Sequence, residues 1–300
     1  MIHIAYHDSY AHKLKENHKF PMKKYNELAK RLVTQNIYSE RSFFIPNKLD
    51  ESILHLTHER SYIDKVKSLT LDKQEERRLG FPQSTELYER ELRITEGTVK
   101  GAILALEHGL SFNIAGGTHH AFTNKGEGFC LFNDIAVSTN YLLEKRMIQK
   151  ALIIDLDVHQ GNGTAQIFSN NNNAFTLSVH GKNNYPLKKE KSDLDIELDD
   201  LTSDEEYLSV ISKIIPELIK SEMPDIVYYL AGADILESDK FGRLSVSIRG
   251  AIERDEIVFS NCKESNIPVM CVMGGGYSKD LEVILEAHLN TFKVGKEYYS

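Results

Sequence analysis

Short apolar runs alternate with amphipathic stretches along the whole chain. The runs are rich in Val, Ile, Leu and Phe, which is typical of strands that are buried on both faces. They cover residues 2–6, 112–115, 151–155, 175–179, 226–231 and 269–273. Between them, apolar residues recur at spacings of three and four, as in 25–33 and 208–218, which predicts helices with one buried face. The alternation predicts a three-layer α/β/α fold with a mostly parallel central sheet.

Nothing in the pattern divides the chain. It contains no internal repeat and no linker rich in Gly, Ser or Pro, so we expect residues 1–300 to form a single domain. A polar patch at 169–173 falls between a predicted helix and a predicted strand. The lysine-rich stretch 182–191 is predicted to be a solvated loop.

The unusual polar residues follow the apolar runs. His119 and His120, the segment 155–159, Asp234, and the segment 274–277 each come just after a predicted strand. An open α/β sheet binds its ligands at the carboxyl edge of its strands. We therefore expect these four segments to converge on one site.

Composition narrows the ligands that such a site could take. Lys and Arg total 36 against 44 Asp and Glu, a formal charge of −8, which disfavours direct binding of nucleic acid. No apolar run is long enough to span a bilayer, and the first ten residues lack the order of a secretory signal, so we expect a cytoplasmic protein. The three cysteines form no C-x-x-C pair. A metal site would therefore use histidines and carboxylates.

Asp155, Asp157 and His159 could form part of such a metal site. In an extended chain, side chains two residues apart point the same way, which brings these three together. Buried carboxylates repel each other unless a cation lies between them. The alternative is a strand end followed by a solvated acidic turn.

Asp234 is the candidate for a third ligand, because it follows an apolar run; a helix N-cap is the competing interpretation. Three protein ligands leave a coordination position open, as in catalytic metal sites. Zn²⁺ suits two carboxylates and an imidazole, and Fe²⁺ suits them as well.

His119, His120 and Tyr277 add acid–base chemistry to the predicted site. Imidazoles transfer protons near neutral pH, and Asp155 and Asn162 are available to orient them. A carboxylate partner raises the pKa of a histidine and an amide partner does not, so the two histidines should differ. A tyrosine after three glycines would donate a hydrogen bond to a developing oxyanion. A phosphate-binding loop is disfavoured there, because the glycines do not follow the G-x-G-x-x-G pattern.

These motifs resemble the zinc-dependent histone deacetylase superfamily. They occur in its order and at its approximate spacing between residues 3 and 292: His119-His120, Gly128-Phe129-Cys130, 155–163, 231–234 and 274–277. Within the superfamily, the segments 158–163, 233–237 and 244–247 are most similar to class IV enzymes and their bacterial relatives.

The resemblance implies an arginase/deacetylase-like fold and the hydrolysis of an N-acyl amine, typically an acylated lysine in a protein or peptide. It implies that zinc is bound by Asp157, His159 and Asp234. It implies catalytic roles for His119 paired with Asp155, His120 paired with Asn162, and Tyr277. It implies substrate contacts at Gly128, Phe129, Gly275 and Tyr185. It implies a potassium ion held by Asp155, Asp157, His159, Ser178 and Val179.

The class IV likeness implies a preference for long fatty-acyl groups over acetyl. One departure from the family pattern concerns the rim aspartate that holds the substrate backbone. It would fall near 81–83, where the chain has no acid, which puts recognition of peptide sequence in doubt.

Three other functions compete with lysine deacylation. Acetylpolyamines or other small N-acyl amines could be hydrolysed by the same residues. A dimanganese site of the arginase type would need a D-x-D pair where the chain has only Asp234. A non-catalytic module that binds acyl-lysine would not require the complete set of motifs. The sequence does not determine the substrate or the oligomeric state.

Overall fold

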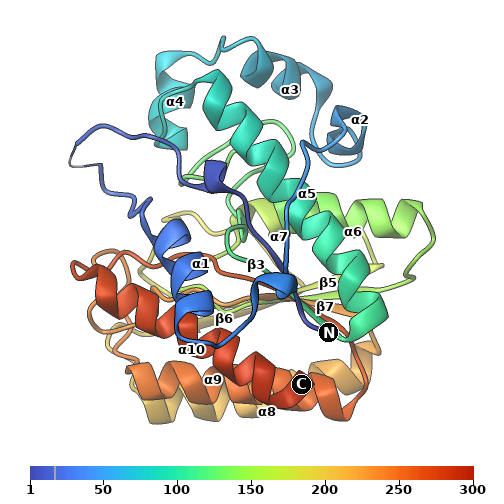
Figure 1. The fold of residues 1–300 in the computed structure, drawn as a ribbon, viewed down its shortest axis with the longest axis vertical. Helices are drawn as coiled ribbons and strands as arrows, with labels where there is room; N and C mark the ends of the chain where they lie inside the picture. Colours follow the sequence, from blue (N-terminus) through green and yellow to red (C-terminus); the bar gives the residue numbers. More distant parts are fainter. Residues whose placement is uncertain (17) are drawn as a thin grey trace.

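The computed structural model describes residues 1–16 and 18–300, and one eight-stranded sheet runs through its middle (Figure 1). The strand order is β2-β1-β3-β8-β7-β4-β5-β6, and every neighbouring pair is parallel. The strands are β1 (His3–Ala5), β2 (Phe43–Phe44), β3 (Leu110–Asn113), β4 (Ala151–Asp155), β5 (Ala174–Gly181), β6 (Leu194–Leu198), β7 (Ile226–Leu230) and β8 (Val269–Val272). The predicted parallel α/β fold is therefore confirmed.

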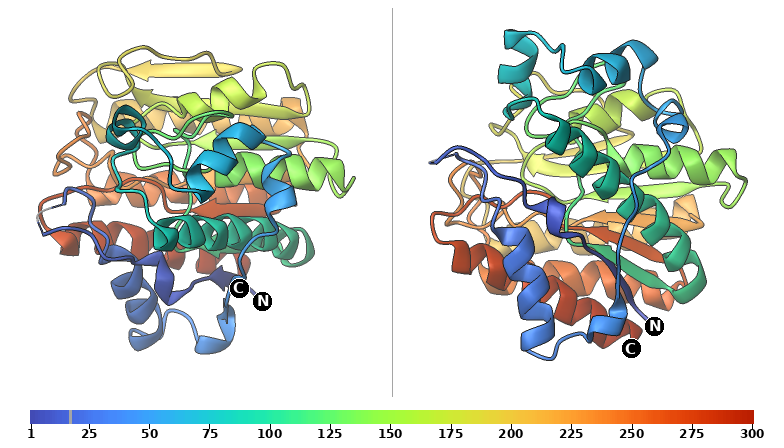
Figure 2. Two further views of the ribbon diagram at one scale, coloured as in Figure 1. Left: turned by 90° about the horizontal axis from the view of Figure 1, so that it is seen from above. Right: turned by 45° about the horizontal axis from the view of Figure 1, so that its top comes forward.

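Helices cover both faces of the sheet (Figures 1 and 2). One face carries α1 (Lys24–Thr34), α8 (Asp204–Glu222), α9 (Ile248–Glu264) and α10 (Leu281–Tyr299). The other face carries α5 (Thr85–His108), α6 (Asp134–Glu144) and α7 (Asn162–Phe168). The short helices α2 (Glu51–Leu54), α3 (Arg60–Lys67) and α4 (Lys73–Leu79) lie beyond α5, at the top of Figure 1.

The sheet separates two apolar cores, because successive side chains of a strand point to opposite faces. Leu152 and Ile154 of β4 belong to the core under α8, α9 and α10, whereas Ile153 belongs to the core shared with α5, α6 and α7. A strand between two such cores reads as a nearly continuous apolar run. All five residues of β4 are buried, and only the last, Asp155, is polar. None of the helices in the described part of the chain is both long enough and apolar enough to cross a membrane.

The topology determines where the site can form. Strands β3, β8, β7 and β4 are consecutive neighbours at the centre of the sheet. Because they are parallel, their carboxyl ends meet at one edge. The four chemically unusual segments of the sequence follow these four strands.

Candidate active site

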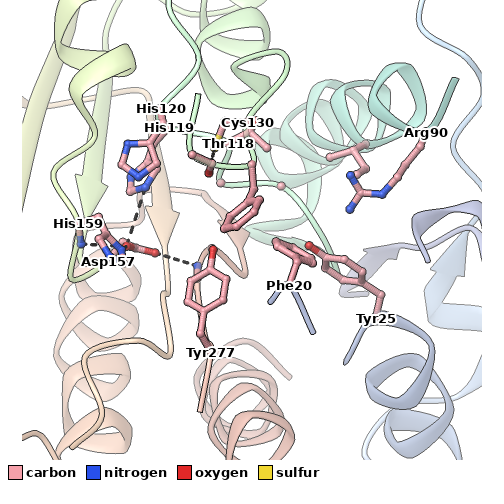
Figure 3. A pocket seen from close by; sticks show the side chains of 17 residues that line it. Phe20, Tyr25, Arg90, Thr118, His119, His120, Cys130, Asp157, His159 and Tyr277 are labelled. Carbon is pink, nitrogen blue, oxygen red and sulfur yellow. Dashed lines mark hydrogen bonds and ion pairs between the residues drawn. The ribbon is translucent and has the colours of Figure 1, made fainter. Parts of the chain in front are cut away.

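Three of the four segments line a pocket on the carboxyl edge of the sheet (Figure 3), and the fourth places Asp234 within hydrogen-bonding distance of His159, one of the lining residues. His119 and His120 follow β3, and Tyr277 follows β8. Asp234 follows β7, and His159 lies beyond the end of β4. Figure 3 shows the histidines and Asp157 gathered on one side of the pocket, with Tyr277 beside them.

Asp157, His159 and Asp234 form a buried cluster that could hold a metal ion. Their ligand atoms all lie within 4.8 Å of one another. His159 Nδ1 lies 3.0 Å from Asp157 Oδ1 and 3.1 Å from Asp234 Oδ2. Two carboxylates this close in a dry site need a positive charge between them. The donor set therefore fits a divalent cation with oxygen and nitrogen ligands.

The pKa of His159 also indicates that this cluster favours a positive charge. Burial alone would lower the pKa of its imidazole, but hydrogen bonds and charge from Asp157 and Asp234 outweigh burial and raise the pKa to about 10. Burial, together with the charge of Asp157, raises the pKa of Asp234 to about 7. The cluster thus takes up positive charge, which a metal ion would supply in place of a proton.

The backbone conformation of residues 155–159 differs from the predicted one. The extended conformation predicted over 155–159 ends at Asp155, and residues 157–159 form a bend. Asp157 N–H donates to Asp155 Oδ1 over 3.1 Å, and His159 N–H donates to Asp157 Oδ1 over 3.0 Å. Each carboxylate thus accepts from the backbone N–H two residues later and stabilises a tight turn, as Asp commonly does. These turns, and not strand pleating, bring the three side chains together.

Asp234 does not cap a helix. It lies in a turn after β7, and the next helix, α9, has Ser247 as its N-cap. Its Oδ1 accepts a hydrogen bond from Val158 N–H over 3.0 Å, so the β4 segment holds this carboxylate in place. The N-cap alternative is therefore wrong.

The two adjacent histidines have different partners. His119 Nδ1 lies 2.7 Å from Asp155 Oδ2, and His120 Nδ1 lies 2.7 Å from Asn162 Oδ1. Burial would lower the pKa of His119, but the charges of Asp155 and Asp157 raise it to about 9. Burial, with the neighbouring His119 and His159, lowers the pKa of His120 well below its usual range. One imidazole is therefore charged and the other neutral at pH 7.

Tyr277 is held by residues from distant parts of the chain. Its backbone N–H donates to Asp239 Oδ2 over 2.6 Å. The ammonium of Lys24, which is 1% exposed, donates to Gly274 O over 3.0 Å. Burial and the charges of Asp234 and Asp157 raise the pKa of Tyr277 well above its usual range. The phenol therefore keeps its proton and can donate a hydrogen bond. Sequence reasoning missed Asp239 and Lys24, which no local motif marks.

Gly128, Phe129 and Tyr185 line a cavity of about 420 Å³ that reaches His159 of the candidate metal site. Phe129 has a φ of 69°, which is rare for an aromatic residue. Its N–H donates to Leu79 O, and Gly128 N–H donates to Arg78 O, which holds this turn against the end of α4. The ring of Tyr185 stands edge-on to His120, with centroids 5.0 Å apart. Gly275 N–H donates to Asp157 Oδ2 over 2.8 Å.

The residues predicted to hold potassium lie at and beyond the end of β4 and inside its neighbour β5. Ser178 is the partner of Asp155 in the register of β4 and β5, and Val179 follows it. The potassium site itself stays a prediction. At 81–83, Phe81 is buried in the core and Gln83 bonds to the backbone of Leu71.

Comparison with known proteins gives consistent matches. The chain matches the model of the histone deacetylase domain over residues 18–292. It is 38% identical to an uncharacterized protein of Picosynechococcus sp., over 99% of each chain. It is 32% identical to Histone deacetylase 2 of Arabidopsis thaliana, over 87% of this chain and 70% of that protein. The crystal structure of an HDAC homolog from Aquifex aeolicus matches with a TM-score of 0.83 and 22% identity, over 98% of this chain and 84% of that one. The last match shows the fold alone.

Proposed function

This chain belongs to the histone deacetylase family, and on that premise we propose that it is a metal-dependent hydrolase that removes the acyl group from N-acyl-lysine side chains. One observation carries the proposal. A buried cluster of metal-ligand type meets two differently paired histidines and a protonated tyrosine at the inner end of one cavity. That combination supplies a cation site, a base and an oxyanion donor together.

The cation would be held by Asp157, His159 and Asp234. Zn²⁺ suits this donor set, and Fe²⁺ would also fit. Three protein ligands leave room for water and for the acyl carbonyl. The chemistry that the cation supplies when bound is Lewis acidity, which lowers the pKa of water and polarises a carbonyl.

His120 is our candidate for the general base, because its pKa keeps it neutral at pH 7. Its Nε2 takes a proton from the attacking water and then gives that proton to the lysine nitrogen as the carbon–nitrogen bond breaks. His119, charged and paired with Asp155, stabilises negative charge beside it. Tyr277 donates its hydroxyl proton in a hydrogen bond to the acyl oxygen, which becomes negative during attack.

The lysine side chain would lie in the cavity between Phe129 and Tyr185, with the carbonyl of Gly128 accepting from the substrate amide. The cavity at the inner end, lined by Phe20 and Tyr25 among others, has a volume of about 40 Å³, little more than a water molecule occupies. This size favours acetyl or another short acyl group. The long-chain preference implied by the class IV likeness would require these aromatic side chains to move.

The charge at the cavity mouth bears on the alternative substrates. Arg78 and Arg243 line the mouth, and no carboxylate is among its described lining residues. Arg243 is paired with Asp200 over 3.1 Å. Acetylpolyamines are cationic, so the charge of Arg78 disfavours them by like-charge repulsion. A non-catalytic binding module would have no use for the differently paired histidines.

The test is metal-dependent deacylation of a fluorogenic lysine series from acetyl to myristoyl, with acetylspermidine as the competing substrate. The enzyme is reconstituted with zinc and compared with its chelated form. We expect hydrolysis of short acyl-lysines that is lost on chelation. Hydrolysis confined to acetylspermidine would show that small N-acyl amines, and not N-acyl-lysines, are the substrates. No hydrolysis of any substrate by the zinc-loaded protein would overturn the proposal.

A further inference from the structure

A third residue extends the pairing of His120 with Asn162. Glu127 directly precedes the Gly128-Phe129 wall, and its side chain is 7% exposed. Its Oε1 accepts from Asn162 Nδ2 over 2.7 Å, and its Oε2 accepts from Lys125 Nζ over 3.1 Å. This buried carboxylate has no role in the chemistry described above, yet it contacts the partner of the candidate base.

The direction of these hydrogen bonds follows from the chemistry of each group. An ionised carboxylate only accepts, so Asn162 must present its NH₂ group to Glu127. The amide oxygen of Asn162 then faces His120, and His120 must donate from Nδ1. A neutral imidazole has a single N–H, so its Nε2 keeps a free lone pair. That is the tautomer that a general base at Nε2 requires.

We propose that Glu127 is a positioning residue that fixes the amide orientation of Asn162 and thereby holds His120 with its proton on Nδ1. The proposal rests on the role proposed above for His120. An amide alone can turn over and offer either its oxygen or its nitrogen. The carboxylate of Glu127 fixes the NH₂ end of Asn162, so the amide oxygen faces His120.

The position of Glu127 is itself rigid. Its backbone N–H donates to Cys130 O and its carbonyl accepts from Cys130 N–H, which closes the turn that carries Gly128 and Phe129. The Tyr185 hydroxyl also donates to Oε1 of Glu127, over 2.8 Å. One carboxylate oxygen therefore holds both the amide behind the base and a wall of the acyl-lysine cavity.

Glu127→Gln tests whether Glu127 determines the direction of the hydrogen bond between Asn162 and His120. The Lys125 ammonium would hold the amide oxygen of the new side chain, which turns the new NH₂ group toward Asn162. Asn162 would then turn over and offer its own NH₂ to His120, so the proton of His120 would move to Nε2. We expect kcat to fall by at least about tenfold, as for other residues that orient a catalytic group, with KM little changed.

Two further variants separate orientation from simple loss of a contact. In Glu127→Gln/Asn162→Asp, a carboxylate faces His120 and can only accept, so we expect kcat to return toward the wild-type value. Lys125→Met removes the ion pair with Glu127 and the contact of the ammonium with the Phe122 ring, 3.9 Å from its centroid. Glu127 keeps a carboxylate that can only accept, so kcat and KM should stay unchanged. Failure of the double variant to recover any of the activity lost by Glu127→Gln would overturn the proposal.

The tautomer can be read without any turnover. In zinc-loaded protein with ¹⁵N-labelled histidine, long-range ¹H–¹⁵N spectra distinguish the two tautomers, and the signals of His120 are assigned by their loss in His120→Asn. We expect the Nδ1–H form in the wild type and the Nε2–H form in Glu127→Gln. An Nε2–H form in the wild type, or no change in the variant, overturns the inference even if acyl-lysine is hydrolysed. The expected change of tautomer in a protein that hydrolyses no acyl-lysine would support the positioning role and overturn the proposed function.

Discussion

Gly275→Ala should weaken metal binding at the site without removing a ligand. The glycine lies against the carboxylates, and a Cβ atom there would be 1.9 Å from Asp234 Oδ2 and 2.8 Å from Asp157 Oδ2. The φ of Gly275 is outside the left-handed region, so an alanine backbone is allowed. The three atoms nearest to the added Cβ all belong to the two candidate carboxylate ligands.

The size of the effect follows from the distances. Cβ atoms essentially never approach another heavy atom within 3.0 Å, so Asp234 Oδ2 would have to retreat by 3.0 minus 1.9, or 1.1 Å. Metal–ligand distances hold to within about 0.2 Å. We therefore expect zinc affinity to fall by at least about 10- to 100-fold, the loss typical when a group that supports a ligand is removed.

The assay is elemental analysis after dialysis against limiting zinc, with affinity from chelator competition and folding checked by circular dichroism. Gly101→Ala in α5 is the matched control. Its Cβ would also be too close, at 2.7 Å, but to the flexible end of the Met270 side chain, which can move. We expect the control to retain zinc. A folded Gly275→Ala protein that binds zinc with wild-type affinity would refute the reasoning.

Three further predictions concern single groups. Tyr277→Phe should keep its zinc but lose about 100- to 1000-fold in kcat, measured by steady-state kinetics, because an oxyanion donor is removed. Asp157→Ala should release zinc on elemental analysis, and a full complement of metal would contradict the ligand assignment. Buried His58 donates from Nδ1 to Phe122 O and accepts at Nε2 from Asn133 N–H, and burial lowers its pKa to about 4. The pKa of His58 is near 6.5 in the unfolded chain, so the unfolded state binds a proton at a higher pH than the folded state. The stability that the neutral side chain provides is therefore complete above pH 6.5 and is lost as pH falls toward 4. The loss is about 3 kcal/mol in the free energy of unfolding, measured by urea titration and absent from the pH profile of His58→Gln.

The central strands could be predicted from the sequence because they are buried on both faces. Each of the six apolar runs overlaps a strand. However, β3 begins and ends two residues before the predicted bounds, and β5 extends beyond the predicted run at both ends. The two missed strands, β2 and β6, lie at the edges of the sheet and are partly exposed. β6 reads Leu-Asp-Ile-Glu-Leu, in which polar residues interrupt the apolar run. Edge strands are only partly covered by the core, so their apolar runs are shorter or interrupted and harder to identify in the sequence.

The convergence of the candidate residues could also be predicted, although one local reason for it was wrong. Residues 157–159 bend instead of continuing the strand, yet the side chains still meet, because β3, β8, β7 and β4 are parallel neighbours. The topology brings the segments to one edge whatever the conformation of each loop. Hydrogen bonds from N–H groups to carboxylates then determine the local geometry.

The residues that orient the site could not be predicted in the same way. Lys24 reaches Gly274 across 250 positions of the chain, and Asp239 holds Tyr277 from a segment without a motif. Such contacts depend on how remote elements pack, which periodicity and spacing do not encode. Glu127 is different, because it adjoins Gly128 and Phe129 and therefore lay next to a recognised motif. An acid directly before the Gly128-Phe129 motif is thus a signal that sequence reasoning could use. Where the partner of a base is an amide, a neighbouring group that can only accept fixes the direction of that amide.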